Sequence, residues 1–266
     1  HSGRIEWGST AIAIADLDGD GVNDIITGDS NSNVVCLRGD GTGIWQDKGM
    51  HGWTLCPAIG DLDSDGKPEV LIGGTEIPVV CLSNEGIMVW QMDTTGRGSS
   101  PVLADLDNDG KLEILCGLGK SIACLDASGK TLWSHPMGGI IDAAITVADA
   151  DQDGFPEIYA ADLSGRFAKL SSKGEISWTR ELGARVRRSP SIGDVDGDGV
   201  IEILVAGYAN AIHVFHPDGL LKAFIPLGEA ANGTATLVDL ESDGCLSIVC
   251  PASYNGMKAF RWEGSP

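Results

Sequence analysis

An acidic motif recurs six times along this chain at an almost constant interval. Its first aspartate returns after 45, 44, 44, 45 and 45 residues. So regular a period over 266 residues predicts a repeat architecture, in which each unit is too small to bury a core alone and packs on its neighbours. The leading residues of the six copies are Asp16, Asp61, Asp105, Asp149, Asp194 and Asp239.

Each period contains four short runs that are typical of strands. In the third period, residues 113–116, 121–125 and 130–133 are apolar or alternating, and Gly, Asn and Asp separate the runs. A further run, such as Ala11 to Ala15, precedes each acidic motif. A β-helix repeats at a shorter interval, whereas four strands in 44 or 45 residues match a β-propeller blade. We therefore predict an all-β, six-bladed β-propeller with four-stranded blades, as one domain over residues 1–266.

The last period lacks its fourth strand, and the start of the chain resembles that strand. Residues 257–264 stop at a Gly turn, while Gly3 to Trp7 has the Gly-x-x-x-Trp spacing of residues 86–90 and 129–133. We expect residues 1–7 to pair with residues 234–264, so that the N-terminal strand completes the last blade and closes the ring. The alternative is that the chain is the N-terminal part of a larger array.

The acidic motif itself predicts a site for a hard cation. Its first copy reads Asp16-x-Asp18-x-Asp20-Gly21-x-x-Asp24, which gives oxygen ligands at positions 1, 3, 5 and 9 and a free carbonyl at position 7. Several carboxylates without a soft ligand favour Ca²⁺ over Zn²⁺. A helix-loop-helix site is excluded, because its acid stands at position 12. The alternative is a polar turn without a metal.

Five copies keep the full ligand set, so we predict Ca²⁺ at five sites. In the sixth copy Glu241 takes position 3 and Ser247 replaces the acid at position 9, so we expect weak binding or none. The predicted ligands, with the position 7 residues contributing carbonyl oxygens, are Asp16, Asp18, Asp20, Val22, Asp24, Asp61, Asp63, Asp65, Lys67, Glu69, Asp105, Asp107, Asp109, Lys111, Glu113, Asp149, Asp151, Asp153, Phe155, Glu157, Asp194, Asp196, Asp198, Val200, Glu202, Asp239, Glu241 and Asp243.

Charge, hydropathy and cysteine usage narrow the class of protein. The net charge is −20, but 23 of the 38 acidic residues lie in the six loops, and without them the charge is −20 + 23 = +3. No basic stripe supports nucleic-acid binding, and no apolar run is long enough to span a membrane. Of the seven cysteines, Cys36, Cys81 and Cys124 recur in phase with the apolar pattern. We interpret them as core residues, with disulfides as the alternative.

These loops between apolar strands resemble the FG-GAP, or VCBS-type, repeats of integrin α-subunit propellers and of many bacterial secreted proteins and lectins. The resemblance covers essentially the whole chain. It implies Ca²⁺ on one face of the ring and ligand binding on the opposite face. The periods are shorter than integrin blades and the Phe-Gly and Gly-Ala-Pro elements are barely visible, so integrin-like adhesion is not carried over.

Ligand binding is expected where the repeats differ, in the connections opposite the acidic loops. Aromatic side chains beside Arg and Asn suit glycans, by stacking and hydrogen bonding, although each of these residues also reads as an ordinary loop residue. Trp53, outside the repeated Trp position, and Trp262, near a turn, are predicted to be exposed. The candidate ligand residues are His51, Trp53, Arg97, Arg187, Arg188, Tyr208, Tyr254 and Asn255.

The sequence thus predicts a monomeric, calcium-stabilised binding module with a glycan or protein ligand, located outside the cell, on the cell surface or in the periplasm. The alternatives are a polysaccharide lyase and a purely structural module of a larger protein. Enzyme signals are poor, because no long insertion builds a cleft. The CGLGKS stretch at residues 116–121 fails as a phosphate loop, since Ile114 stands where the first Gly is required.

Overall fold

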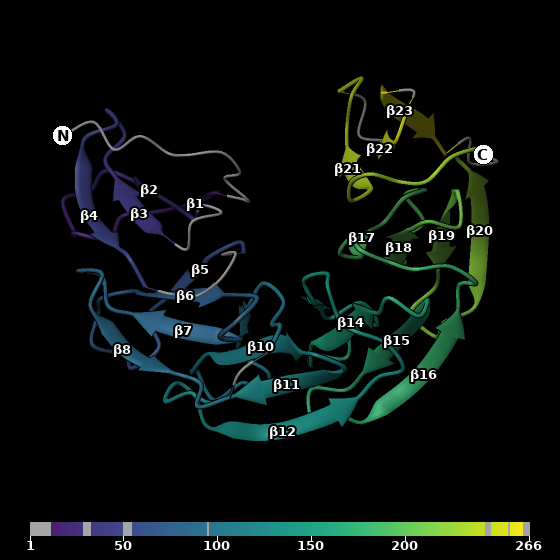
Figure 1. Ribbon diagram of the computed structural model, residues 1–266. Coiled ribbons are helices and arrows are strands. Elements are labelled where there is room, and N and C mark those ends of the chain that lie inside the picture. The colour runs from purple at the N-terminus through teal and green to yellow at the C-terminus, as the bar shows by residue number, and fades with distance from the viewer. Residues whose placement is uncertain are drawn as a thin grey trace. The chain divides into compact units, whose positions relative to one another are not determined.

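The computed structural model describes residues 12–28, 33–49, 55–94, 96–242, 246–254 and 256–262. Within these ranges the chain forms strands β1 to β23 and no helix (Figure 1). A membrane-crossing helix is accordingly not found in the described part of the chain. The predicted all-β class with six repeated sheets is confirmed.

The chain divides into two compact units, residues 1–136 and 137–266, each with three sheets. The first unit holds β1 (Ile12–Ala15), β2 (Asp24–Gly28), β3 (Val34–Leu37), β4 (Gly43–Asp47), β5 (Ala58–Gly60), β6 (Glu69–Gly73), β7 (Val79–Leu82), β8 (Met88–Gln91), β9 (Val102–Ala104), β10 (Glu113–Leu118), β11 (Ser121–Leu125) and β12 (Thr131–Pro136). The second holds β13 (Thr146–Ala148), β14 (Glu157–Ala161), β15 (Arg166–Leu170), β16 (Ile176–Glu181), β17 (Ser191–Gly193), β18 (Glu202–Ala206), β19 (Ala211–Phe215), β20 (Leu221–Pro226), β21 (Thr236–Val238), β22 (Ser247–Ala252) and β23 (Gly256–Arg261).

Every sheet is an antiparallel meander whose spatial order follows the chain. Five sheets have four strands, and the sixth has three, β21 to β23, in the described residues. The predicted closing strand at residues 1–7 and the end of the chain at residues 263–266 lie outside the described residues, so ring closure stays a prediction. The CGLGKS stretch forms the β10–β11 hairpin, in which Leu118 pairs with Ser121, and it makes no phosphate loop.

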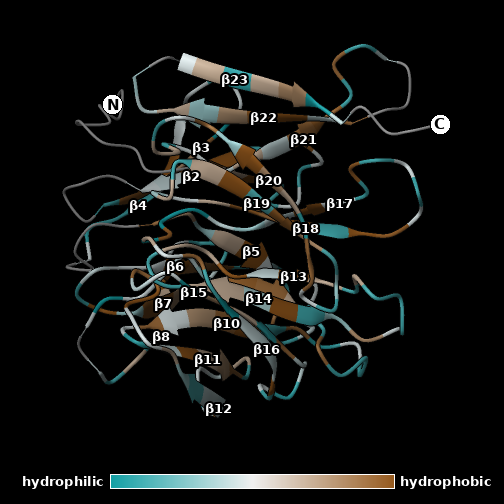
Figure 2. Cartoon of the chain, turned by 90° about the vertical axis from the view of Figure 1, so that its right-hand side faces the viewer, coloured by the Kyte–Doolittle hydropathy of each residue, from teal (hydrophilic) through white to brown (hydrophobic). Residues whose placement is uncertain are grey.

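The core lies along the two middle strands of each sheet. All five residues of β14 and of β18 are buried, whereas the fourth strands β8 and β12 are largely exposed. Figure 2 shows much of the hydrophobic colour on the strands, whereas the outer strand β12 and many loops carry hydrophilic colour. Cys36, Cys81, Cys116, Cys124 and Cys250 are buried free thiols. Burial raises the pKa of Cys116 to about 12, which supports their interpretation as core residues.

A tryptophan from one sheet packs on a glycine of the next and explains the repeated Gly-x-x-x-Trp spacing. Trp90 Nε1 donates a hydrogen bond to the carbonyl of Ala127 at 2.9 Å. A Cβ added to Gly129 would lie 2.7 Å from the Trp90 ring. Trp45 and Trp178 make the same bond to the carbonyls of Asn84 and Pro217, and their rings cover Gly86 and Gly219. These contacts join neighbouring sheets within each unit.

We predict that Gly129→Ala lowers the free energy of unfolding by about 2–4 kcal/mol. Its backbone has φ +81°, which costs a side chain roughly 1–2 kcal/mol, and the new methyl group must also displace the Trp90 ring. Gly119→Ala is the matched control, because φ is +57° there and the added Cβ meets nothing within 4 Å. In urea unfolding the control should lose only the free energy that the left-handed backbone costs. Equal losses of unfolding free energy in the two variants would contradict the packing argument.

Candidate metal centres

The acidic loops all join the first strand of a sheet to its second strand. Their backbones share one conformation. Position 6 is a glycine with φ between +85° and +92° at Gly21, Gly66, Gly110, Gly154 and Gly199. Position 4 is also left-handed, at Gly19, Ser64, Asn108, Gln152, Gly197 and Ser242. The glycine at position 6 is visible in the repeated motif, whereas the left-handed position 4 is not, because Ser and Gln are unusual residues for φ > 0.

The position 1 aspartate organises each loop. In the third loop Asp105 Oδ1 accepts the amide N–H of Asp109 at 3.1 Å and Oδ2 accepts that of Gly110 at 2.9 Å. The position 5 aspartate then accepts the position 7 N–H, from Lys111 to Asp109 Oδ1 at 2.8 Å. That bond holds the pKa of Asp109 below its usual value. The corresponding bonds to Asp61, Asp149 and Asp194 repeat this geometry.

The position 9 acid faces back into the loop from the start of the second strand. Glu113 Oε2 accepts the N–H of Leu106 at 2.8 Å, and Asp24, Glu69, Glu157 and Glu202 accept the equivalent amides. Burial, and then the neighbouring aspartates, raise the pKa of Glu69 and Glu113. A charged carboxylate at position 9 is therefore costly unless a cation lies beside it.

In five loops the carboxylate oxygens converge within 4.8 Å of one another. The converging groups are Asp16, Asp18 and Asp24; Asp61, Asp63 and Glu69; Asp105, Asp107 and Glu113; Asp149, Asp151, Asp153 and Glu157; and Asp194, Asp196 and Glu202. Among the position 5 residues that the structure describes, only Asp153 joins its group. In the sixth loop Asp243 lies outside the described residues, and Asp239 and Glu241 form no such group with the residues that are described.

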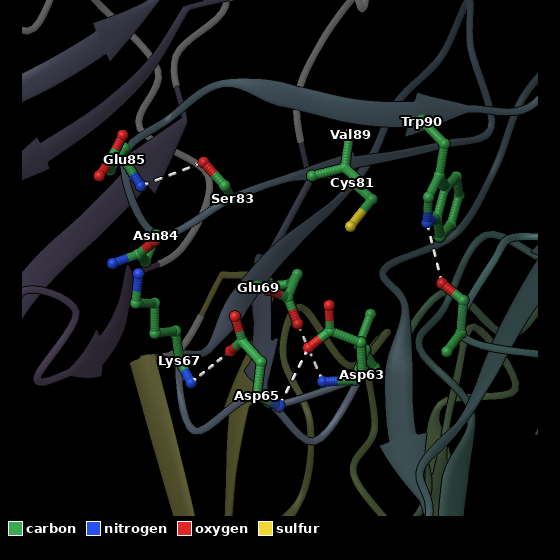
Figure 3. A pocket seen from close by; sticks show the side chains of 12 residues that line it. Asp63, Asp65, Lys67, Glu69, Cys81, Ser83, Asn84, Glu85, Val89 and Trp90 are labelled. Atoms are coloured by element: carbon green, nitrogen blue, oxygen red, sulfur yellow. Dashed lines mark hydrogen bonds between the residues drawn. The ribbon is translucent and has the colours of Figure 1, made fainter.

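The second loop shows how open such a cluster is. A cavity of about 310 Å³ lies beside it, lined by Asp63, Asp65 and Glu69 and by Trp90 of the same sheet. In Figure 3 the carboxylates of these three acids face one another, and Trp90 donates to the carbonyl of the next sheet. The donor atoms are all oxygens, which suits Ca²⁺, and the cavity beside them leaves space for the ion.

In the second unit two lysine side chains contact the acidic clusters. Lys169 Nζ lies 2.6 Å from Asp151 Oδ2 and 3.4 Å from Glu157 Oε1. Lys222 Nζ lies 2.6 Å from Asp196 Oδ2 and 2.7 Å from Glu202 Oε1. Burial alone would lower the pKa of Lys222, but hydrogen bonds to Asp196 and Glu202 raise it. The hydrogen bond from Lys169 lowers the pKa of Asp151.

Sequence reasoning missed these lysines, although one of them leaves a signal. Lys169 pairs with Trp178 as Cys36 pairs with Trp45. A lysine at the position where other sheets carry a core cysteine indicates a buried charge with a partner. Two arginines contact two of the other acidic loops. Arg38 contacts Asp18 at 3.2 Å with nearly half of its side chain exposed, and Arg261 contacts Glu241.

The candidate ligand residues that the structure describes lie at the strand ends away from the acidic loops. Arg97 lies between β8 and β9, and its carbonyl accepts the N–H of Gly119. Arg187 and Arg188 lie between β16 and β17, Tyr208 between β18 and β19, and Tyr254 between β22 and β23. His51, Trp53 and Asn255 lie outside the described residues. Trp262 is half-buried against the core of the second unit, so the prediction that it is exposed is wrong.

In the second unit a chain of contacts links these connections. The N–H of Tyr208 donates to the carbonyl of Arg185 at 3.0 Å, and Arg188 contacts Asn232 Oδ1 at 3.5 Å. The N–H of Tyr254 donates to Glu229 Oε2 at 2.7 Å. Tyr208 is 42% exposed and Tyr254 is 90% exposed, so both rings are available for contact.

The first two acidic loops match a known family model. The model described as an FG-GAP-like repeat matches residues 16–72, and it confirms the resemblance drawn from the repeated motif. A comparison with curated proteins finds no match.

Solved structures match over most of the chain. The V. cholerae biofilm matrix protein Bap1 is 25% identical with a TM-score of 0.65, and the match covers 84% of this chain and 40% of Bap1. BBS1N, solved in complex with ARL6DN, is 12% identical with a TM-score of 0.69, over 96% and 79%. The exotype rhamnogalacturonan lyase YesX is 16% identical with a TM-score of 0.68, over 93% and 54%. The chain thus spans less than half of Bap1, and the other two likenesses concern the fold alone.

We predict that Glu113→Gln stabilises the metal-free protein at neutral pH. The amide keeps the acceptor for the Leu106 N–H but removes a charge whose raised pKa shows that folding opposes it. A raised carboxyl pKa favours folding at low pH, so the advantage should shrink as the pH falls through that pKa and Glu113 becomes protonated.

Urea unfolding in EDTA at neutral and at acidic pH checks this prediction. Glu175→Gln, at an exposed turn position, is the control and should change stability little at either pH. A Glu113→Gln variant that is less stable than the parent at neutral pH would contradict the electrostatic argument.

Proposed function

We propose that this chain is a calcium-braced binding module that works outside the cell, on the cell surface or in the periplasm. The observation that carries the proposal is the repetition of one carboxylate arrangement in five loops. Each loop joins the same two strands and places the position 9 acid at the start of a buried strand. A cation at that point would hold the first two strands of each sheet together.

Calcium is the cation that this donor set favours. Extracellular modules bind Ca²⁺ with dissociation constants of about 10⁻⁴–10⁻³ M, and an all-carboxylate and carbonyl set has no ligand that selects a softer metal. The same arrangement recurs in several sheets, whereas a catalytic ion would single out one. We therefore assign the ions a structural role. The predicted sixth site would bind weakly or not at all.

The ligand surface that we propose is the end of the second unit away from the acidic loops. It presents two exposed tyrosine rings, Tyr208 and Tyr254, and a further connection at the same strand ends carries Arg187, which contacts Asp142, and Arg188, which contacts Asn232. Aromatic rings stack on sugar faces, and guanidinium groups pair with carboxylates, so an acidic glycan is the ligand of first choice. The likeness to a biofilm matrix protein supports a matrix setting. A protein ligand is the second choice.

We also propose that the module acts as a monomer and is not an enzyme. The fold of a rhamnogalacturonan lyase resembles this chain, and a polysaccharide lyase remains the alternative to test. Incubation with rhamnogalacturonan and other uronate polymers should produce no unsaturated product by ultraviolet absorbance. If that absorbance increases with the concentration of this protein, a catalytic proposal would replace the binding proposal.

A thermal melt with and without calcium tests the structural role of the ions. At ten to twenty times its dissociation constant, one site adds about 1.5 kcal/mol of stability. Millimolar Ca²⁺ should therefore raise the melting temperature well above its value in EDTA, while Mg²⁺ at the same concentration should do less. Identical melts with Ca²⁺ and EDTA, together with no metal in the purified protein by elemental analysis, would reject the proposal.

A glycan array tests the ligand surface. We expect binding to acidic glycans at millimolar Ca²⁺, and Tyr208→Ala or Tyr254→Ala should weaken it about tenfold, since one aromatic contact contributes about 0.5–1.5 kcal/mol. Phe224→Ala, an exposed aromatic on the outer strand β20, is the matched control. Absence of glycan binding, or equal losses in the control, would argue against this surface.

A further inference from the structure

The five acidic clusters differ in whether the protein supplies a cation of its own. Among the described residues of the first unit, the basic side chains that touch the acidic loops are exposed: Arg38 contacts Asp18, and Lys111, with 69% of its side chain exposed, contacts Asp109, which lies outside the converging group. Within the described residues no basic side chain contacts the position 9 acids Glu69 and Glu113. The charge on these two acids would have to be balanced by a cation from solution.

In the second unit an ammonium group stands between the ligands. Lys169 contacts Asp151 and Glu157, and Lys222 contacts Asp196 and Glu202, which in both loops are the acids at positions 3 and 9. The two lysines reach the same pair of positions from different strands, since Lys169 lies on β15 and Lys222 on β20. Because lysines on two different strands contact the same pair of acids, the charge of the loop, rather than the position of one strand, accounts for a lysine there.

The two ammonium groups cannot easily leave. The side chain of Lys169 is 8% exposed and that of Lys222 is 11% exposed. Lys222 Nζ also lies 5.5 Å from the centre of the Trp262 ring, which favours a cation there. If Ca²⁺ took the carboxylates, it would leave a buried ammonium without its counter-ions and beside a divalent charge, which is strongly unfavourable.

We propose that Lys169 and Lys222 replace the divalent cation in the loops between β13 and β14 and between β17 and β18. This inference rests on the proposed calcium function and restricts it. Five clusters less the two that hold a lysine leave three, so the tight calcium sites lie in residues 1–136. The second unit, which carries the proposed ligand surface, is then braced at any calcium concentration.

Calcium stoichiometry of the full chain, by equilibrium dialysis and elemental analysis, tests the proposal. We expect three ions per wild-type chain, four in Lys169→Met and in Lys222→Met, and five in the double variant. Methionine keeps the apolar stem and removes the charge. Lys173→Met is the control, because Lys173 lies in the exposed β15–β16 turn of the same unit, and it should still bind three ions.

Hydrogen exchange supplies a readout that does not depend on stoichiometry. Removing calcium from the wild type should reduce protection in β6 and β10 and leave β14 and β18 unchanged. In the methionine variants β14 and β18 should become calcium-dependent. If those variants unfold in EDTA, millimolar Ca²⁺ should restore the fold, and failure of this rescue would overturn the proposal.

The remaining outcomes separate this inference from the function on which it rests. Five ions on the wild type, or methionine variants that bind no more ions than the wild type, would overturn the lysine inference and leave the calcium function intact. No calcium on any chain would overturn both.

Discussion

Mutual repulsion among the carboxylates of each acidic loop is the constraint on which the rest of this structure depends. Each of five loops places four acids within nine residues, and at least three of them converge within 4.8 Å. The position 9 acid begins the buried second strand, so the loop cannot relax by moving that carboxylate into solvent. Every such sheet therefore gathers negative charge at the same point, and in two of the sheets a lysine side chain lies among the acids.

The contacts between tryptophan and glycine act between neighbouring sheets, whereas each acidic loop acts within one sheet. The position 9 acid ties the second strand of a sheet to the loop after its first strand, whereas Trp45, Trp90 and Trp178 each hydrogen-bond to the next sheet and cover its turn glycine. A sheet of three or four strands buries little surface by itself, so neither kind of contact alone stabilises it strongly. Buried hydrophobic clusters span neighbouring sheets in each unit, and the loops at the opposite strand ends stay free to vary.

That division leaves the connections opposite the acidic loops as the places where the repeats can differ. The loops that carry the acids repeat with the same spacing and the same φ values at positions 4 and 6, so they have little freedom to diverge. The connections at the other ends of the strands differ in length and composition. In the second unit they bring together Arg185, Tyr208, Glu229 and Tyr254 through backbone and carboxylate contacts. Residues can change there without disturbing the repeated cores.

The sequence by itself determined the repeats, the strands and the carboxylate ligand positions, because a 44- or 45-residue period and alternating apolar runs are local properties. It also showed that Gly and Trp recur together, and the structure supplied the reason. Only the tertiary structure decided which charges meet. Lys169 and Lys222 come from different strands, and Lys222 is twenty residues from Glu202, so no local pattern predicts that both enter an acidic loop. The burial of Trp262 beside Lys222 is likewise set by packing between sheets.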